Sequence, residues 1–201
     1  AVVIACNTST AHALDVLREE SPVPVIGVIE PGARAAVASG GEGPVGVIGT
    51  AGTIASDAYG RAIRRLAPEA VVVQRPCPLF VPLVEEGWFD HPAAELVARE
   101  YLAPLGAAGV RSLVLGCTHY PLLTGLLERV MGPEVTLVDS GRETAGAVEQ
   151  VLREKGMMRK STGEPQHRFA VSDDPDRFRT VGVRFVGERL GAAEVVSVEG
   201  G

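Results

Sequence analysis

The segment Val47-Ile48-Gly49-Thr50-Ala51-Gly52-Thr53 passes from an apolar run through a glycine-rich turn into a helical pattern. This run is one of eight short apolar stretches, which cover residues 2–5, 24–28, 45–48, 70–73, 112–115, 135–138, 169–171 and 194–198. They are rich in valine and mostly apolar on both faces, as strands buried inside a parallel sheet are. Helical patterns separate them, for example over residues 53–66 and from Asp174-Pro175 onward. The alternation predicts an α/β fold with doubly wound, mainly parallel sheets.

The composition of the 201-residue chain fits a globular protein with one large or two small domains. Apolar residues make up 46% of the chain and charged residues 22%, so a sizeable core can form without disulfides or metal ions. The formal net charge of −6 disfavours binding to nucleic acid or to an anionic membrane. No apolar run approaches the length of a transmembrane helix. We therefore expect neither nucleic acid nor a membrane among its partners.

The chain contains three cysteines, Cys6, Cys77 and Cys117. An odd number without Cys-x-x-Cys spacing argues against a disulfide framework and against a zinc site, and it favours a reducing, cytoplasmic location. The only two lysines, Lys155 and Lys160, do not follow a predicted strand, which argues against a pyridoxal Schiff base. The sequence therefore predicts no metal and no cofactor.

Cys6 and Cys117 each follow an apolar run and precede a helical pattern. Ligands of open α/β sheets bind beyond the carboxyl ends of the strands, and a helix N-terminus lowers the pKa of a nearby thiol. The two surroundings also resemble each other, since Val3-Ile4-Ala5-Cys6-Asn7-Thr8 has the pattern of Val114-Leu115-Gly116-Cys117-Thr118-His119. This match favours a functional pair of thiols over two buried structural cysteines.

Two thiols in corresponding positions suit two kinds of chemistry. In the first, a thiolate removes a proton from one face of a carbon centre and a thiol returns a proton to the other face. In the second, the two cysteines form a disulfide on oxidation. The spacing of the cysteines does not decide between these two kinds of chemistry. His119 either polarises the neighbouring thiol, orients a carboxylate or caps a helix. Cys77, within Pro76-Cys77-Pro78, is interpreted as structural.

Polar side chains follow the same strand ends. Thr50 and Thr53, with the glycines of their turn, suit a bound carboxylate at a helix N-terminus, and a tight turn with capping threonines is the alternative. Asn7 and Thr8 offer similar donors after Cys6. Glu85-Glu86 follows a proline-rich segment and is interpreted as a solvated pair at the start of a loop.

Two segments are interpreted as breaks between lobes of the fold. They are Glu30-Pro31-Gly32, after the second apolar run, and Asp139-Ser140-Gly141, after the sixth. We expect the chain to cross between lobes at both places. Residues 1–30 and 139–201 would then form a first lobe, and residues 31–138 a second.

Together, Ala5-Cys6-Asn7-Thr8 and Gly116-Cys117-Thr118-His119-Tyr120-Pro121 resemble the two cysteine signatures of bacterial glutamate racemases. Residues 24–28, 49–53 and 77–85 are similar to segments that this family has in corresponding places. The resemblance runs over essentially the whole chain, and the pair of signatures is much more specific than either one alone.

The resemblance implies a cofactor-independent racemase that interconverts L- and D-glutamate and supplies D-glutamate for peptidoglycan synthesis, and thus for cell wall biogenesis and cell shape. It implies two pseudo-symmetric α/β lobes with the site in the cleft between them, and a homodimer. Cys6 and Cys117 would be the acid/base thiols. The other residues it implies are Asn7, Thr8, Thr50, Thr53 and Thr118 for substrate binding, with His119 and Glu85 as auxiliary catalytic residues beside the second thiol.

The start of the chain departs from the family pattern. The family begins with a strand that ends in an Asp-Ser-Gly turn, followed by a Pro-Tyr-Gly loop, whereas only five residues precede Cys6 here. Asp139-Ser140-Gly141 corresponds instead to the family's later lobe crossing. We therefore expect the native gene to encode an N-terminal extension, and residues 1–201 alone to be poorly soluble and inactive. The alternatives are an aspartate racemase or related isomerase, or a non-catalytic thiol or ligand-binding protein on the same fold.

Overall fold

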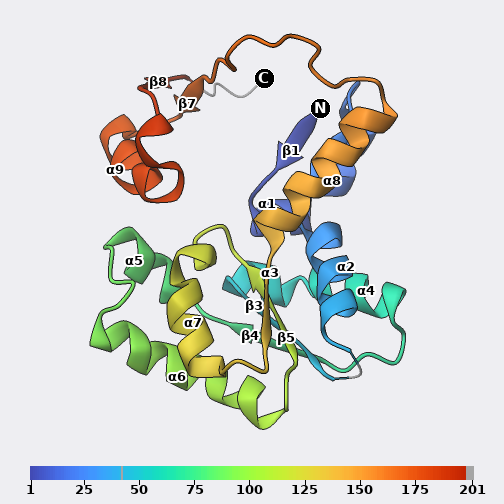
Figure 1. Ribbon diagram of the computed structural model, residues 1–201, viewed down its shortest axis with the longest axis vertical. Coiled ribbons are helices and arrows are strands. Elements are labelled where there is room, and N and C mark those ends of the chain that lie inside the picture. Colours follow the sequence, from blue (N-terminus) through green and yellow to red (C-terminus); the bar gives the residue numbers. More distant parts are fainter. Residues whose placement is uncertain (42, 198–201) are drawn as a thin grey trace. The chain divides into compact units, whose positions relative to one another are not determined.

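The computed structural model describes residues 1–41 and 43–197, which fold as two compact units, one up to Met158 and the other from Arg159 onward (Figure 1). The strands are β1 (Val2–Ile4), β2 (Val25–Gly27), β3 (Val45–Gly49), β4 (Val72–Pro76), β5 (Ser112–Gly116), β6 (Thr136–Asp139), β7 (Phe169–Val171) and β8 (Ala193–Val195). The helices are α1 (Asn7–Glu20), α2 (Ile29–Ser39), α3 (Ala51–Ala55), α4 (Ala58–Leu66), α5 (Phe80–Glu85), α6 (Pro92–Ala107), α7 (Thr124–Met131), α8 (Ser140–Glu154) and α9 (Pro175–Val186), with 3-10 helices η1 (Tyr120–Leu123) and η2 (Gly187–Arg189).

Each of the eight predicted apolar runs overlaps a strand, and every strand pair is parallel. The α/β fold class is therefore confirmed. The last run ends at Val198, which lies outside the described residues. The predicted start of a late helix is also confirmed, because the Asp174 carboxylate accepts a hydrogen bond from the backbone N–H of Arg177 in the first turn of α9.

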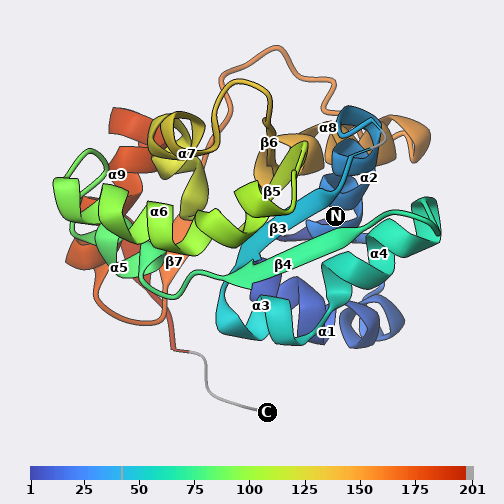
Figure 2. The ribbon, with the colours of Figure 1, turned by 90° about the horizontal axis from the view of Figure 1, so that it is seen from below.

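The central element of the first unit is a four-stranded sheet with the order β4-β3-β5-β6 (Figure 2). The chain passes from β3 outward to β4 and then returns to the other side of β3 to form β5. In α/β sheets, a ligand crevice forms where the strand order reverses in this way, beyond the carboxyl ends of the two strands. Gly49 and Gly116 are register partners at these ends of β3 and β5, so the turns that follow them are neighbours.

Helices cover both faces of this sheet because neighbouring residues of a strand point to opposite faces. Val47 of β3 and Val114 of β5 are buried among residues of α2 and α4. Ile48 and Leu115, the next residues, are buried among residues of α5, α6 and α7. Figure 2 shows β3, β4 and β5 between these two groups of helices. The sheet is therefore doubly wound, as the runs of apolar residues predict.

A separate two-stranded sheet carries the start of the chain. β1 pairs with β2, and α1 packs against both strands through Leu14. In the described part of the chain β2 is the one strand that pairs with β1, and Val2 and Val3 are 45% and 42% exposed. The carboxyl end of β1 leads directly into α1, and Cys6 lies at this junction.

Two local predictions are wrong. Glu30-Pro31-Gly32 does not break the chain, because it lies in the first turn of α2. Proline is tolerated there, since the first N–H groups of a helix have no intrahelical acceptor. Residues 53–66 do not form one helix, because Asp57 has φ 50° and separates α3 from α4. Its carboxylate bonds to Gln74 and Arg64, and these contacts hold the left-handed backbone in place.

The predicted lobe boundaries near residues 30 and 139 coincide with the ends of two sheets, β1-β2 and β4-β3-β5-β6. The first sheet ends before residue 30, and the four-stranded sheet ends at Asp139. Asp139-Ser140-Gly141 joins β6 to α8, with the Asp139 carboxylate capping the helix through the N–H groups of Gly141 and Arg142. The assignment of residues 1–30 and 139–201 to one lobe remains a prediction.

Candidate active site

Cys117 follows β5 directly, at the carboxyl end of the sheet where the strand order reverses. Its side chain is 7% exposed, and its Sγ lies 4.0 Å from Nδ1 of His119. Burial raises the pKa of the Cys117 thiol, and hydrogen bonds from the backbone N–H groups of His119 and Thr118 offset only part of this increase. Cys117 is therefore a thiol rather than a thiolate at neutral pH.

His119 lies between the thiol and a carboxylate. Its Nε2 is 3.4 Å from Oε1 of Glu85, and its Nδ1 is 3.2 Å from the hydroxyl of Thr118. Glu85 is the last residue of α5, a partly buried position, whereas its neighbour Glu86 is exposed. The interpretation of Glu85-Glu86 as a solvated pair is thus correct for Glu86 and wrong for Glu85. Glu85, His119, Thr118 and Cys117 form one group.

Cys6 is the N-cap residue of α1, and its Sγ accepts a hydrogen bond from the backbone N–H of Ser9 at 3.5 Å. Partial burial raises the pKa of the Cys6 thiol, but hydrogen bonds from Ser9 and Thr8 outweigh this effect and leave the pKa below its usual value. Unlike Cys117, Cys6 is exposed. A helix N-terminus stabilises a thiolate in this position, as the sequence pattern predicts.

The two thiols are coupled electrostatically. Beside burial, the negative charge of a Cys6 thiolate contributes to the raised pKa of Cys117. Their pKa values move in opposite directions. Between the two pKa values the site therefore holds one thiolate and one thiol.

Three threonine hydroxyls form a closed triangle beside Cys6. Oγ1 of Thr8 lies 2.7 Å from that of Thr50 and 3.0 Å from that of Thr53, and the last two are 3.0 Å apart. Thr8 belongs to α1, while Thr50 caps α3, where its Oγ1 accepts from the backbone N–H of Thr53. The capping alternative is thus correct for Thr50, and the triangle also brings the Cys6 turn to the turn after β3.

Asn7 is 2% exposed, and its side chain bonds to two residues that sequence reasoning missed. Its Oδ1 accepts from the Tyr59 hydroxyl at 2.7 Å, and its Nδ2 donates to Oγ of Ser140 at 3.5 Å. Nothing local distinguishes Tyr59 from the other apolar positions of α4. Ser140 lies in the segment interpreted as a break, so its hydroxyl received no role.

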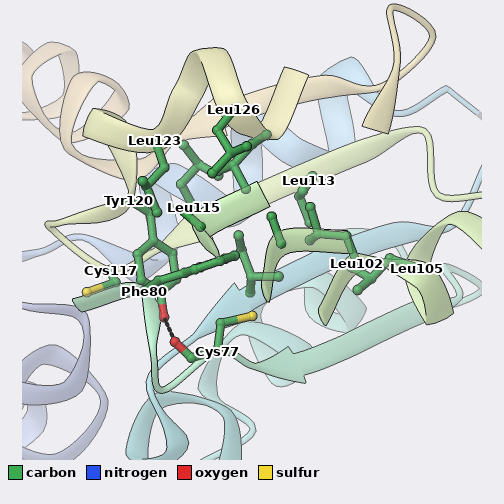
Figure 3. Close-up of a cluster of buried hydrophobic side chains, with 14 of the residues drawn as sticks. Cys77, Phe80, Leu102, Leu105, Leu113, Leu115, Cys117, Tyr120, Leu123 and Leu126 are labelled. Carbon is green, nitrogen blue, oxygen red and sulfur yellow. Dashed lines mark hydrogen bonds between the residues drawn. The ribbon is translucent and has the colours of Figure 1, made fainter. Parts of the chain in front are cut away.

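Cys77 lies in the buried cluster formed by β5, α5, α6 and α7, where burial raises the pKa of its thiol to about 12. Its carbonyl oxygen accepts from the Tyr120 hydroxyl at 2.9 Å. Figure 3 shows the sulfur of Cys117 at the edge of the cluster, pointing away from Cys77. This placement supports the interpretation of Cys77 as structural. All three cysteines are free thiols.

The described residues offer no metal centre, because they contain no group of three or more His, Cys, Asp or Glu side chains arranged to hold an ion. The absence of a cofactor remains a prediction. In residues 1–41 and 43–197, no helix combines the length and the apolar character needed to cross a membrane.

Comparison with known proteins identifies the family. Residues 1–148 match the family model described as Asp/Glu/Hydantoin racemase. The glutamate racemase of Geobacter metallireducens is 53% identical over 198 residues, which make up 98% of this chain and 73% of that protein. The structure of glutamate racemase from Francisella tularensis in complex with D-glutamate superimposes with a TM-score of 0.91 and 36% identity, covering 99% of this chain and 74% of that one.

A glutamate racemase isoform from Bacillus anthracis gives a TM-score of 0.90 at 36% identity, over 98% of this chain and 73% of that one. The sequence and structure comparisons thus point to the same family, which is also the family that the two cysteine turns at the ends of β1 and β5 resemble. The chain belongs to the glutamate racemases of the Asp/Glu/Hydantoin racemase family.

Proposed function

We propose that the protein interconverts L- and D-glutamate with Cys6 and Cys117 as its two acid/base groups. The observation that carries this proposal is the placement of the two thiols, with Cys6 capping α1 after β1 and Cys117 following β5 beside His119, and their pKa values shift in opposite directions. Racemisation by two bases needs one group that accepts a proton and another that donates one at the same time. A thiol with a lowered pKa and a thiol with a raised pKa suit these two tasks.

In one direction, the Cys6 thiolate takes the proton from Cα of glutamate and becomes a thiol. The electron pair left on Cα takes a proton from the Cys117 thiol on the opposite face, and Cys117 becomes a thiolate. The product has the inverted configuration, and the number of protons in the site is unchanged. The reverse reaction starts from this second state. The resting state returns when the exposed Cys6 thiol releases its proton to water and the Cys117 thiolate takes one up from solvent after product leaves.

We assign substrate binding to Asn7, Thr8, Thr50, Thr53 and Thr118. Thr8 and Thr50 are partly exposed and can turn their hydroxyls from the triangle toward a carboxylate, whereas Thr53 is buried and holds the other two in place. Thr118 is exposed beside Cys117. The Oδ1 of Asn7 is bonded to Tyr59 and its Nδ2 donates one hydrogen to Ser140, so Asn7 can offer the second Nδ2 hydrogen. Donors of this kind stabilise negative charge on a substrate carboxylate as Cα loses its proton.

We further propose that His119 and Glu85 serve the Cys117 thiol. The imidazole lies near enough to Cys117 to exchange a proton with it after a small movement, and Glu85 orients the ring from its other side. The raised pKa of a buried thiol slows formation of the thiolate that the reverse reaction needs. A neighbouring imidazole offsets this difficulty by stabilising the charged form.

The test is proton NMR of the full-length protein with D-glutamate in heavy water. We expect L-glutamate to form with deuterium at Cα, because the proton that enters comes from a thiol equilibrated with solvent. D-Aspartate is the matched control and addresses the closest alternative, an aspartate racemase. If aspartate is converted faster than glutamate, the protein is an aspartate racemase instead. If neither amino acid is converted and a disulfide forms reversibly, the thiol redox alternative is favoured.

We also propose that the protein acts as a cytoplasmic homodimer and that its D-glutamate is used for peptidoglycan synthesis. Three free cysteines suit a reducing compartment. Light scattering of the full-length protein as it elutes from a size-exclusion column measures the mass of the oligomer. A mass equal to one chain at working concentration would contradict the dimer.

A further inference from the structure

A buried chain of hydrogen bonds joins the two cysteine turns. The Tyr59 hydroxyl donates to Oδ1 of Asn7 at 2.7 Å, and Nδ2 of Asn7 donates to Oγ of Ser140 at 3.5 Å. Oγ of Ser140 in turn donates to the carbonyl oxygen of Leu115 at 3.1 Å. Asn7 directly follows Cys6, and Leu115 is two residues before Cys117. The chain of bonds thus runs from one thiol turn to the other.

Tyr59 also touches the second turn with its ring. A Cβ atom added to Gly116, the residue before Cys117, would meet Cε2 of Tyr59 at 3.3 Å. A Cβ atom added to Gly32 in α2 would meet the Tyr59 hydroxyl at 3.1 Å and Cβ of Ser140 at 3.2 Å. The fully buried ring therefore lies between α2 and the end of β5. The Tyr59 side chain therefore contacts both Asn7, which follows Cys6, and Gly116, which precedes Cys117.

The direction of these bonds is fixed. Burial raises the pKa of Tyr59 well above its usual range, so its hydroxyl stays protonated and donates. The amide of Asn7 must then present Oδ1 to Tyr59 and Nδ2 to Ser140. Ser140 uses its one hydrogen for Leu115 and accepts from Asn7. A buried network in which every member has a partner holds one arrangement and resists displacement.

We infer that Tyr59 and Ser140 are positioning residues that set the separation of the Cys6 and Cys117 thiols across the substrate carbon. This inference rests on the proposed two-thiol racemisation. β1 and β5 belong to different sheets, so the backbone ladder does not fix the distance between their ends. Displacement of about 1 Å between reacting groups can reduce a rate about 10²-fold. The Tyr59–Asn7–Ser140–Leu115 chain ties the Cys6 turn directly to the strand that carries Cys117, whereas the threonine triangle ties it to the turn after β3.

The test compares Tyr59→Phe and Ser140→Ala in the full-length protein with Ser112→Ala as the matched control. Ser112 is also a buried serine, and its hydroxyl donates to the Ala36 carbonyl at 3.0 Å from β5, but it lies at the opposite end of that strand from Cys117. Tyr59→Phe keeps the ring and removes the hydroxyl. Thermal unfolding of each variant separates loss of folded protein from loss of positioning.

We expect kcat to fall about 10- to 100-fold in Tyr59→Phe and Ser140→Ala, with a much smaller change in KM. The deuterium isotope effect on kcat with α-deuterated glutamate should rise in both directions, because proton transfer becomes slower than the other steps. The double variant should be close to the more severe single variant, since both act through the same chain. Ser112→Ala should change neither kcat nor the isotope effect.

A second measurement does not depend on activity. In a Cys77→Ala background, bifunctional thiol reagents of increasing length should cross-link Cys6 to Cys117 with a narrow optimum, which broadens in Tyr59→Phe and Ser140→Ala. An unchanged optimum, or kcat losses that match the loss of folded protein, would overturn the positioning role. If the unsubstituted protein shows the narrow optimum but does not racemise glutamate, the proposed function fails while the geometric assignment stands.

Discussion

The imidazole of His119 lies 3.4 Å, from Nε2 to Oε1, from the carboxylate of Glu85 at the end of α5. This contact directs the other ring nitrogen toward the Thr118 hydroxyl and the Cys117 thiol. A carboxylate, an imidazole and a thiol thereby lie in a row beyond the carboxyl end of β5. The alignment supports the proposal that His119 and Glu85 serve Cys117, whereas Cys6 is exposed at its helix N-terminus.

Replacing Glu85 by glutamine tests this alignment. Glu85→Gln keeps the shape of the side chain and removes its charge, so the imidazole loses the carboxylate that orients it. We expect kcat to fall about tenfold or more, with the larger effect in the direction that needs Cys117 as the base. Glu86→Gln is the control, because Glu86 is the adjacent exposed carboxylate. Equal effects in both variants would contradict the role of Glu85.

Alkylation should distinguish the three thiols by pH. Because the pKa of Cys6 is lowered, its reactive thiolate forms at a lower pH than that of an ordinary cysteine. Burial raises the pKa of Cys117, and it raises that of Cys77 to about 12. As pH increases from 6 to 9 we expect iodoacetamide to label Cys6 first, as measured by peptide mass spectrometry. Labelling of Cys117 before Cys6 would show that Cys117, and not Cys6, is the thiol that ionises more readily.

Removal of either acid/base thiol should stop racemisation. Cys6→Ala and Cys117→Ala each leave one face of the substrate without a proton carrier, so we expect the rate of conversion to fall by about 10²–10⁴ or more, as measured by polarimetry. Cys77→Ala is the matched control, since this thiol is buried among apolar side chains. It should keep its activity while losing some thermal stability. Normal turnover in a Cys6 or Cys117 variant would exclude the two-thiol mechanism.

Sequence reasoning located the strands and the cysteine turns because their signals are local. An apolar run that ends in a small residue and a cap predicts a strand end, and the positions of Cys6 and Cys117 follow from this pattern alone. The prediction of a chain break at Pro31 is wrong because it also rests on a local signal. A proline marks either a break or the first turn of a helix, and Pro31 lies in the first turn of α2.

The contacts between distant segments could not be predicted. The bonds of Asn7 to Tyr59 and Ser140 depend on how α4 and α8 pack against α1, and residue spacing does not report this packing. Glu85 differs from Glu86 only in which way it faces at the end of α5. The sequence therefore predicted which side chains are candidates, whereas their partners required the packing of the helices.

The hydroxyl triangle makes a last prediction about substrate affinity. Thr53 is buried and bonds to the hydroxyls of both Thr8 and Thr50, so Thr53→Val preserves volume and removes the group that orders the other two. We expect KM for glutamate to rise more than kcat falls, because the proton-carrying thiols are not changed. The loss of one buried hydrogen-bonding partner should also lower the free energy of unfolding by about 1–3 kcal/mol.

Thr124→Val is a suitable comparison for Thr53→Val, since the Thr124 hydroxyl is partly buried and donates to the Pro121 carbonyl at 2.7 Å, outside the triangle. Chemical denaturation should show that both variants lose stability, whereas only Thr53→Val should bind glutamate more weakly in steady-state kinetics. Two variants with equal losses of stability and unchanged KM would mean that the triangle only caps α3. In that case Thr8 and Thr50 would hold the substrate without help from Thr53, or would not contact it at all.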